Sequence, residues 1–201
     1  MFGARQSLRT IIARMVARKR QFALVGGLAV SARTTPRFTK DADVAVLAHS
    51  DQEAEQIVYD VSRDGFEVVM LVEQAATGRL GTARLGLPDD QDEGAVIDLL
   101  FASSGIEPEV IQAAQSLELF TGLITPVATI GHLIAMKVLS RNDDTRPQDI
   151  IDLRALMIEA TADDLMQAEA GLRLITERGY HREKDLHADY AALLARFRPG
   201  G

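Results

Sequence analysis

The hydrophobic pattern changes near Pro126, and this change constrains the fold more than any other feature of the chain. Before it, short apolar runs predict strands at 22–25, 44–47, 66–72, 79–87 and 95–102, with helices at about 4–20, 27–33 and 51–64 and a short one from Pro108. After it, apolar residues recur at helical spacing, which predicts helices at about 129–141, 147–159, 162–178 and 186–197. This order predicts an α+β fold, with a mixed core over residues 1–125 and a helical region over 126–201.

The amino-acid composition limits the classes of protein to which the chain can belong. The 201 residues are 47% hydrophobic and 25% charged, which is typical of a globular chain that can bury a core. There is no cysteine, which excludes disulfides and thiolate zinc sites. No apolar run approaches the length of a membrane span, so we expect a cytoplasmic protein without a membrane partner.

Charge is distributed unevenly along the chain. The net charge is -7, yet residues 1–40 contain nine Lys and Arg residues and no acidic residue. A basic segment on an acidic body predicts a phosphate-rich partner or an acidic protein partner. A solvated basic helix face is the alternative that the sequence leaves open.

Two aspartates, Asp41 and Asp43, precede the apolar run 44–47. Residues two apart in a strand point to the same face, so the two carboxylates are expected to project together while Val44 and Val46 face the core. Oxygen ligands in this arrangement suit Mg²⁺. The alternative is a pair of acids that cap or solvate the start of the strand.

Asp98 is the only polar residue in the apolar run AVIDLLF. An ionised carboxylate is costly to bury unless it is paired or binds a metal, so Asp98 is a third candidate ligand. A salt bridge to an arginine is the alternative. If its strand lies beside strand 44–47, three carboxylates meet on one face, which suits two Mg²⁺ ions in phosphoryl transfer.

Gly26 and Gly27 follow a predicted strand and open a predicted helix. Glycine permits close approach to the backbone, and a helix N-terminus presents unpaired N–H groups to phosphate oxygens. The turn therefore predicts a site for a nucleotide phosphate.

Lys137 falls on the apolar stripe of the predicted helix 129–141. A lysine in that position snorkels, pairs with an acid, or reaches a phosphate as a point charge, and the nearby aspartates favour the phosphate. Arg141 lies one turn further along the same helix and is a further candidate for nucleotide binding.

Two aspartates in the following helix receive different interpretations. Asp152 lies at the edge of the apolar stripe, and we expect it to orient Lys137 or Arg141 through a charge-assisted hydrogen bond. Asp149 lies in the first turn, where a negative charge complements the helix dipole, and is interpreted as structural.

Together these stretches resemble the nucleotidyltransferases related to the AbiEii/AbiGii toxins, within the DNA polymerase β type superfamily. GGLAVSARTTPRFTKDADVAV resembles their first motif, and VIDLLF, HLIAMKVLSR and RPQDIIDL resemble the later motifs in the same order. The resemblance spans about residues 20–160, and the mycobacterial toxins of the family are the members that it indicates.

The resemblance implies a Mg²⁺-dependent enzyme, with a two-metal site, that transfers nucleotides from NTP to the 3′ end of tRNA. Such transfer blocks aminoacylation and translation, and a cognate antitoxin controls it. In this resemblance Asp41 and Asp43 bind the metal, and Asp98 takes the place of the third carboxylate. The nucleotide phosphates are bound by Gly26, Gly27 and Lys137. Asp152 completes the active site.

Gly27 departs from the pattern of the superfamily, in which many members have a serine whose hydroxyl helps to hold phosphate. Backbone N–H groups, Ser31, Thr39 or Lys137 must then take over this task. Thr39 also lies two residues before Asp41. A phosphate on its hydroxyl would occupy the phosphate pocket, so we predict regulatory phosphorylation at Thr39, which mass spectrometry can test.

Two other functions stay open at this point. The same fold could modify a hydroxyl of a protein or of a small molecule. Alternatively, the chain could be a non-catalytic module that binds a nucleotide or a partner protein.

Overall fold

The computed structural model describes residues 2–37, 39, 41–86, 96–142 and 144–198. Within them, seven strands form one mixed sheet in the order β3-β4-β5-β2-β1-β7-β6, and helices flank it, which confirms the predicted α+β fold. The strands are β1 (Phe22–Val25), β2 (Ala42–Val46), β3 (Glu67–Glu73), β4 (Leu80–Gly86), β5 (Val96–Leu100), β6 (Gln115–Phe120) and β7 (Leu123–Val127). The helices are α1 (Phe2–Ala17), α2 (Gly26–Arg33), α3 (Asp51–Arg63), α4 (Glu107–Gln112), α5 (Ile130–Ser140), α6 (Pro147–Glu159), α7 (Ala162–Glu177) and α8 (Leu186–Phe197).

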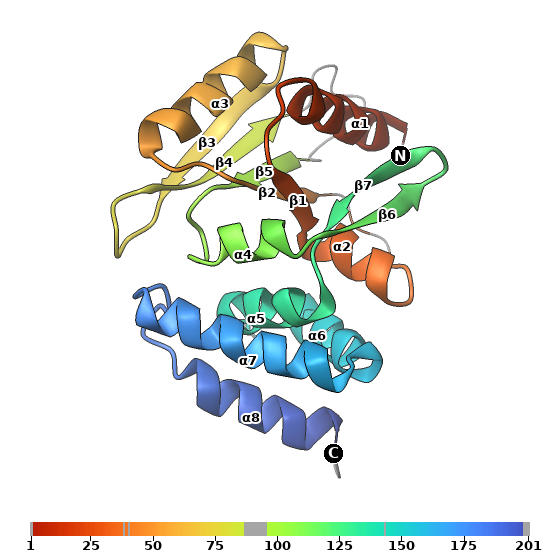
Figure 1. The fold of residues 1–201 in the computed structure, drawn as a ribbon, viewed down its shortest axis with the longest axis vertical. Coiled ribbons are helices and arrows are strands. Elements are labelled where there is room, and N and C mark those ends of the chain that lie inside the picture. The colour runs from red at the N-terminus through yellow and green to blue at the C-terminus, as the bar shows by residue number, and fades with distance from the viewer. Residues whose placement is uncertain (1, 38, 40, 87–95, 143, 199–201) are drawn as a thin grey trace.

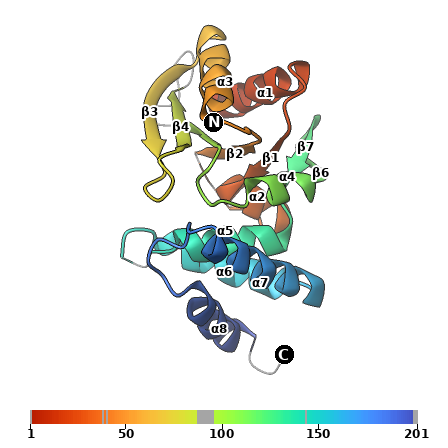
Figure 2. The same cartoon turned by 60° about the vertical axis from the view of Figure 1, so that its left-hand side comes forward.

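The helices form layers on the two faces of the sheet. Figure 1 shows α1 and α3 on one face and α2 and α4 on the other, with α5 to α8 stacked beyond them. The turned view in Figure 2 keeps this arrangement. Helix α2 contacts both α5 and α6, so it connects the sheet to the C-terminal helices. None of the described helices is long and apolar enough to cross a membrane.

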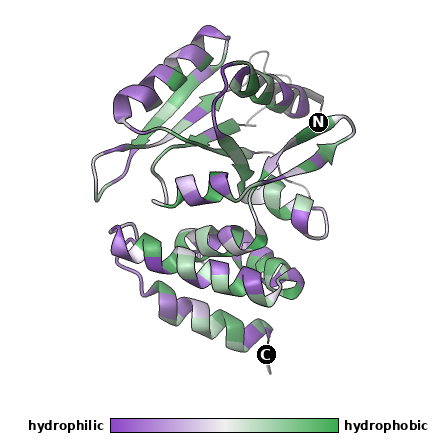
Figure 3. Cartoon of the chain, viewed as in Figure 1, coloured by the Kyte–Doolittle hydropathy of each residue, from purple (hydrophilic) through white to green (hydrophobic). Residues whose placement is uncertain are grey.

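Local sequence signals fix where several helices begin. The Ser50 side chain accepts a hydrogen bond from the Glu53 N–H at the start of α3, and Thr161 and Asp164 form a reciprocal capping box at the start of α7. Both starts were predicted. Figure 3 shows hydrophilic residues spread over α3 and hydrophobic residues along the central strands, the pattern from which these elements are predicted.

The hairpin β6–β7 was not predicted. The residues of β6 are exposed or half-buried, and β7 contains Pro126, which sequence reasoning takes as the end of the strand region. β7 nevertheless pairs in parallel with β1 through Leu24 and Val127 and leads directly into α5. The predicted boundary between residues 125 and 126 falls inside this strand.

The basic helix α1 is fastened to the rest of the chain. Its apolar stripe, formed by Leu8, Ile11, Ile12 and Met15, is buried. Just after its end, Arg18 donates to the Asp64 carboxylate at 2.6 Å, and Arg14 within the helix lies 3.6 Å from the same group. Arg9 donates to the Thr121 main-chain oxygen at 2.6 Å, in the turn of the β6–β7 hairpin. Much of the basic charge of this segment is therefore engaged within the molecule.

We predict that Arg18→Ala lowers the free energy of unfolding by about 1 kcal/mol at low ionic strength, because partly exposed ion pairs contribute on that scale. The loss should shrink in about 0.5 M NaCl, since salt screens such pairs. Urea unfolding measures both values. Arg154→Ala is the matched control, because Arg154 is exposed and has no ion pair among the described residues. A loss that salt leaves unchanged would contradict the ion-pair explanation.

Candidate active site

The three predicted carboxylates lie at the same end of two adjacent strands. β2 and β5 run in parallel, and their register sets Asp43 directly beside Asp98. Asp41 immediately precedes β2, and its carboxylate accepts a hydrogen bond of 3.4 Å from the Val96 N–H. Within the described residues, no three acidic or histidine side chains converge into a complete metal site. The structure therefore places these acids close to one another, but the described residues alone do not form a complete set of metal ligands.

Asp98 is held by an arginine. Arg84 is its register partner on β4 and donates two hydrogen bonds to its carboxylate, at 2.9 and 2.7 Å. This is the salt bridge that the sequence leaves open as the alternative to metal binding. Because Asp98 is 7% exposed, a bidentate cation is what makes its burial tolerable. Arg84 itself was not predicted as a site residue.

Asp43 is in a different situation, because none of the described residues donates a hydrogen bond to its carboxylate. Burial, the neighbouring Asp98 carboxylate and, more weakly, Asp41 raise the pKa of Asp43 to about 6, whereas Lys137 and Arg146 act to lower it. A carboxylate that is half-buried, next to other carboxylates and short of a cation fits a divalent metal ion. Asp41 and Asp43 are the residues that would hold it.

Gly26 lies against the Asp43 carboxylate. Its φ is +63°, and a Cβ at this position would come within 1.8 Å of Asp43 Oδ2. No other residue fits there, because both the backbone angle and the contact require glycine. The first glycine of the predicted phosphate turn is thus in direct contact with the predicted metal ligand.

Lys137 lies in a buried acidic cluster. Its amine donates to Asp149 Oδ1 at 2.6 Å and lies 2.9 Å from Asp152 Oδ2, and the residue is 9% exposed. The contact with Asp152 has the geometry expected from the sequence. Asp149 does more than complement the helix dipole, since it is also the nearest partner of Lys137 and accepts a hydrogen bond from Ser140.

Asp152 also holds an arginine that the sequence analysis missed. Arg37, in the loop before β2, donates to both oxygens of Asp152 at 2.7 Å. Burial alone would raise the pKa of Asp152, but the hydrogen bonds from Arg37 and Lys137 outweigh it and lower the pKa. A charged residue in a polar loop carries no periodic signal, so nothing in the sequence pattern singles out Arg37.

The remaining predicted nucleotide-binding residues lie around this centre in different ways. The Ser31 hydroxyl accepts from the Arg37 N–H and donates to the Arg37 carbonyl, so it holds the loop. The Thr39 hydroxyl donates to the Asp41 carbonyl at 3.4 Å. Arg141 follows α5, and its carbonyl accepts from Lys184. Nucleotide binding by these three residues, and phosphorylation of Thr39, stay predictions.

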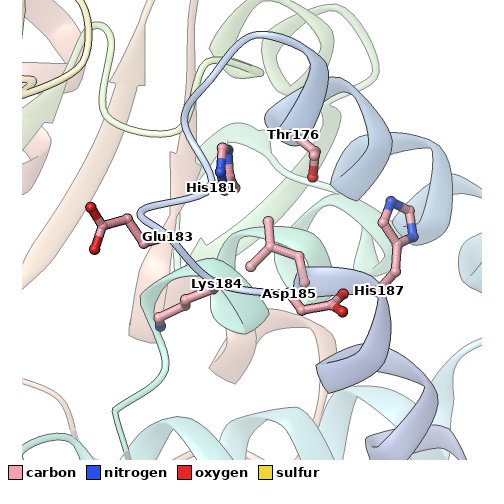
Figure 4. Close-up of a pocket in the computed structure, with 7 residues that line it drawn as sticks. Thr176, His181, Glu183, Lys184, Asp185 and His187 are labelled. Carbon is pink, nitrogen blue, oxygen red and sulfur yellow. The ribbon is translucent and has the colours of Figure 1, made fainter.

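A separate pocket of about 360 Å³ lies where α7 leads into α8. Figure 4 shows that its side chains come from the end of α7, the following loop and the start of α8, with Glu183 and His187 on opposite sides. None of the predicted site residues lines it. The acids and histidines around this pocket do not form a metal-binding group, so the carboxylates near Gly26 stay the candidate site.

A family model matches nearly the whole chain. Residues 11–200 match the model described as "Nucleotidyl transferase AbiEii toxin, Type IV TA system". The chain belongs to this family. It is therefore a nucleotidyltransferase of the toxin type, and its family implies an antitoxin partner. This confirms the family resemblance seen in the sequence, and the likeness to the mycobacterial members in particular stays a prediction.

Solved structures agree on the fold. The chain is similar to an antigenic nucleotidyltransferase-like protein from Paracoccidioides brasiliensis, at 17% identity with a TM-score of 0.51, covering 93% of each chain. It is also similar to ANT(2″)-Ia in complex with adenylyl-2″-tobramycin, at 15% identity with a TM-score of 0.51, covering 94% of this chain and 96% of that one. No curated protein matches the chain. At these identities the likeness establishes the nucleotidyltransferase fold of this AbiEii family member.

We predict that Asp43→Asn stabilises the metal-free protein at pH 7.5 by about 1–2 kcal/mol. A pKa raised from 3.8 to about 6 means that the folded state favours the neutral acid. The stabilisation that comes from protonation of Asp43 in the folded state is present below pH 4 and is lost as the pH rises through 6. Two pKa units correspond to about 3 kcal/mol, which partial exposure reduces.

Thermal unfolding in EDTA between pH 4 and 8 measures how the stability of the wild type falls as the pH rises. The part of this fall that comes from Asp43 should be missing in Asp43→Asn. Adding Mg²⁺ should raise the unfolding temperature of the wild type and not that of Asp43→Asn, because the variant loses a ligand. Equal stabilisation of both proteins by Mg²⁺ would remove Asp43 from the metal site.

We predict that Lys137→Met destabilises the fold by about 3 kcal/mol, because it leaves Asp149 and Asp152 buried with one cation fewer. Lys137→Met combined with Asp149→Asn should recover part of this loss, since the second change removes the uncompensated charge. Denaturant unfolding of the wild type, both single variants and the double variant forms the cycle that measures the coupling. Strictly additive losses would show that Lys137 and Asp149 do not stabilise each other.

Proposed function

We propose that this toxin is a Mg²⁺-dependent nucleotidyltransferase that adds nucleotides from NTP to the 3′ end of tRNA, blocks aminoacylation and so stops translation in the cytoplasm. The observation that carries the proposal is the contact of Gly26 with Asp43, beside Asp41 and Asp98. A glycine turn against the Asp43 carboxylate supports the proposal, because transfer from a nucleoside triphosphate requires a phosphate site next to a cation site.

The residues of the chain act by binding and positioning. Asp41 and Asp43 would hold Mg²⁺, which supplies activation of the attacking hydroxyl and neutralisation of the triphosphate. The glycine turn approaches the phosphate chain through its backbone. The acceptor hydroxyl then attacks the α-phosphorus, and the bond to the β-phosphate breaks with release of pyrophosphate. Lys137, Asp149 and Asp152 support this geometry through a buried network that needs no rearrangement during the reaction.

The choice of tRNA as acceptor rests on the resemblance to toxins of this family. Arg14 and Arg9 of α1 are engaged with Asp64 and the β6–β7 turn, so this helix is a weaker candidate for backbone contacts than the sequence indicates. Arg146 is exposed, lies 3.6 Å from Asp149 and influences Asp43. A basic residue beside the carboxylates is better placed to receive the acceptor end.

A small-molecule hydroxyl is the second candidate acceptor. The observation that favours it is the similarity of fold to ANT(2″)-Ia, whose complex contains adenylyl-2″-tobramycin. The engaged arginines of α1 are also compatible with a substrate smaller than RNA. Both candidates share the carboxylates and differ only in the group that receives the nucleotide.

We predict that the purified protein transfers label from at least one of the four α-³²P NTPs to total tRNA in the presence of Mg²⁺. Asp41→Ala and Asp43→Ala should each abolish the transfer, because each removes a metal ligand. Asp163→Ala, an exposed acid in the first turn of α7, should leave transfer unchanged. Gel electrophoresis of the labelled RNA measures the product.

The acceptor controls separate the candidates. Periodate-oxidised tRNA lacks the terminal hydroxyls and should receive no label. Label on an aminoglycoside, with none on tRNA, would support the second candidate, and label on added protein alone would support modification of a protein hydroxyl. Absence of label on every acceptor with all four NTPs would defeat the enzymatic proposal and favour a module that only binds nucleotide.

A further inference from the structure

Strand β3 forms one edge of the sheet, and its sequence is apolar. It stands first in the order β3-β4-β5-β2-β1-β7-β6, and within the described residues it pairs with β4 alone. Figure 2 shows β3 on the outer side of β4. Its seven residues, EVVMLVE, include neither Lys nor Pro, the residues by which natural edge strands discourage further pairing. The outer backbone groups of β3 are therefore available to another strand.

The side chains of β3 are exposed on both faces of the sheet. Three consecutive residues, Met70, Leu71 and Val72, pair regularly with β4, so their side chains alternate between the two faces. They are 50%, 54% and 45% exposed, and Val69 before them is 53% exposed. The other exposed large apolar side chains of the described chain are scattered over α1, α3, α6, α7 and β7. At β3 such side chains instead form a continuous apolar surface.

The opposite edge of the sheet, β6, is protected where β3 is not. Its apolar residues are half-buried, and Glu118 interrupts them within the strand. Arg5 of α1 also lies over the ring of Phe120, with 4.5 Å between the guanidinium carbon and the ring centroid. In β3 the charged residues stand only at the two ends, as Glu67 and Glu73, and the centre is left apolar. The fold thus covers one edge and leaves the other open.

The two ends of β3 define the charge of a matching partner. Glu67 and Glu73 are exposed, and neither has an ion pair among the described residues. Residues 64–78 contain no Lys or Arg that could neutralise them locally. Opposite charges across paired strands are stabilising, and like charges are destabilising. At about 3.3 Å per residue the two glutamates are about 20 Å apart, so a complementary strand carries bases about six residues apart.

A second copy of this chain matches the edge poorly. Antiparallel pairing of two β3 strands about Met70 sets Glu67 of each copy against Glu73 of the other, which brings like charges together twice. A register shifted by two residues sets a glutamate against an apolar residue and gains no ion pair. The charges of the edge therefore favour a different protein over a second copy.

We infer that β3 is a docking site for another protein, which adds to this edge an extended segment with an apolar centre and Lys or Arg at both ends. Main-chain hydrogen bonds supply the affinity, and the pairs with Glu67 and Glu73 supply the selectivity. Met70 is in register with Arg84, Asp98 and Asp43, so the added segment lies four strand spacings, about 19 Å, from Asp43. The inference goes beyond the proposed transfer reaction, and either can fail while the other stands.

Fluorescence anisotropy of labelled peptides with the full-length protein tests the inference. The probe is a seven-residue peptide with blocked termini, Lys at both ends and alternating Val and Thr between them. It should bind with a dissociation constant on the order of 10–100 µM, and the same peptide with Glu at both ends should bind about 10-fold more weakly. Methylation of every inner backbone nitrogen should abolish binding, because strand pairing requires those N–H groups.

Charge-reversed variants test the selectivity. Glu67→Lys combined with Glu73→Lys should reverse the preference, so that the Glu-ended peptide binds about 10-fold more tightly than the Lys-ended one. Glu67→Gln with Glu73→Gln, the milder pair, should remove the preference. Glu159→Lys with Glu169→Lys makes the same change of net charge at exposed positions on α6 and α7, and should keep the wild-type preference. Circular dichroism confirms that each variant is folded.

Several results would overturn the inference. They are no binding of either peptide, equal binding of both, an unchanged preference in the folded charge-reversed and Gln variants, and binding of the methylated peptide. Reversal by the control pair on α6 and α7 would assign the effect to net charge and would also overturn it. Sedimentation velocity from 1 to 100 µM, as orders of magnitude set by the expected affinity, tests for the second copy. A wild-type dimer that Met70→Lys dissociates, with Met166→Lys leaving it intact, would give the edge to a second copy instead.

Discussion

Asp152 is almost completely buried, and its carboxylate holds Arg37 from the sheet layer and Lys137 from α5. A carboxylate so far from water is tolerated only when cations replace its hydration, and removing one of them leaves an uncompensated charge. The packing of helix α6 therefore places this carboxylate against cations from both the loop before β2 and helix α5. This one group joins the helical region to the loop between α2 and β2.

Of the two neighbouring sheet carboxylates, one is neutralised by an arginine and the other is not, and this difference creates the candidate metal site. The register sets Asp43 beside Asp98, which costs energy because like charges repel. Arg84 neutralises Asp98 with two hydrogen bonds, while the described residues supply no such partner for Asp43. Gly26 lies against one side of the Asp43 carboxylate and, because it has no side chain, offers no side-chain hydrogen bond to it. Among the described residues, Asp43 is therefore the sheet carboxylate without a hydrogen-bonding cation, which is why it is the proposed metal ligand.

The sequence predicts those parts that depend on local pattern. The caps at Ser50 and Thr161 set helix starts, and Asp98 and Lys137 are conspicuous because each interrupts an apolar pattern. Arg37 and Arg84 lie in a loop and in a strand of alternating exposure, where a charge is ordinary, so only their partners reveal them. Those partners are set by strand order and helix packing, which join residues far apart in the chain. The hairpin that carries β7 was missed for a similar reason, since its pairing with β1 overrides the signal of Pro126.

The balance of charge indicates in which form the nucleotide binds. Around the site, the described residues include five aspartates (Asp41, Asp43, Asp98, Asp149 and Asp152) and four bases (Arg37, Arg84, Lys137 and Arg146). The arginines of α1 cannot shift this balance, because they are engaged with Asp64 and the hairpin. A bare triphosphate would meet several carboxylates, in a molecule that is itself acidic. The nucleotide is therefore expected to enter together with its cation, which neutralises the phosphates and satisfies Asp43 in the same step.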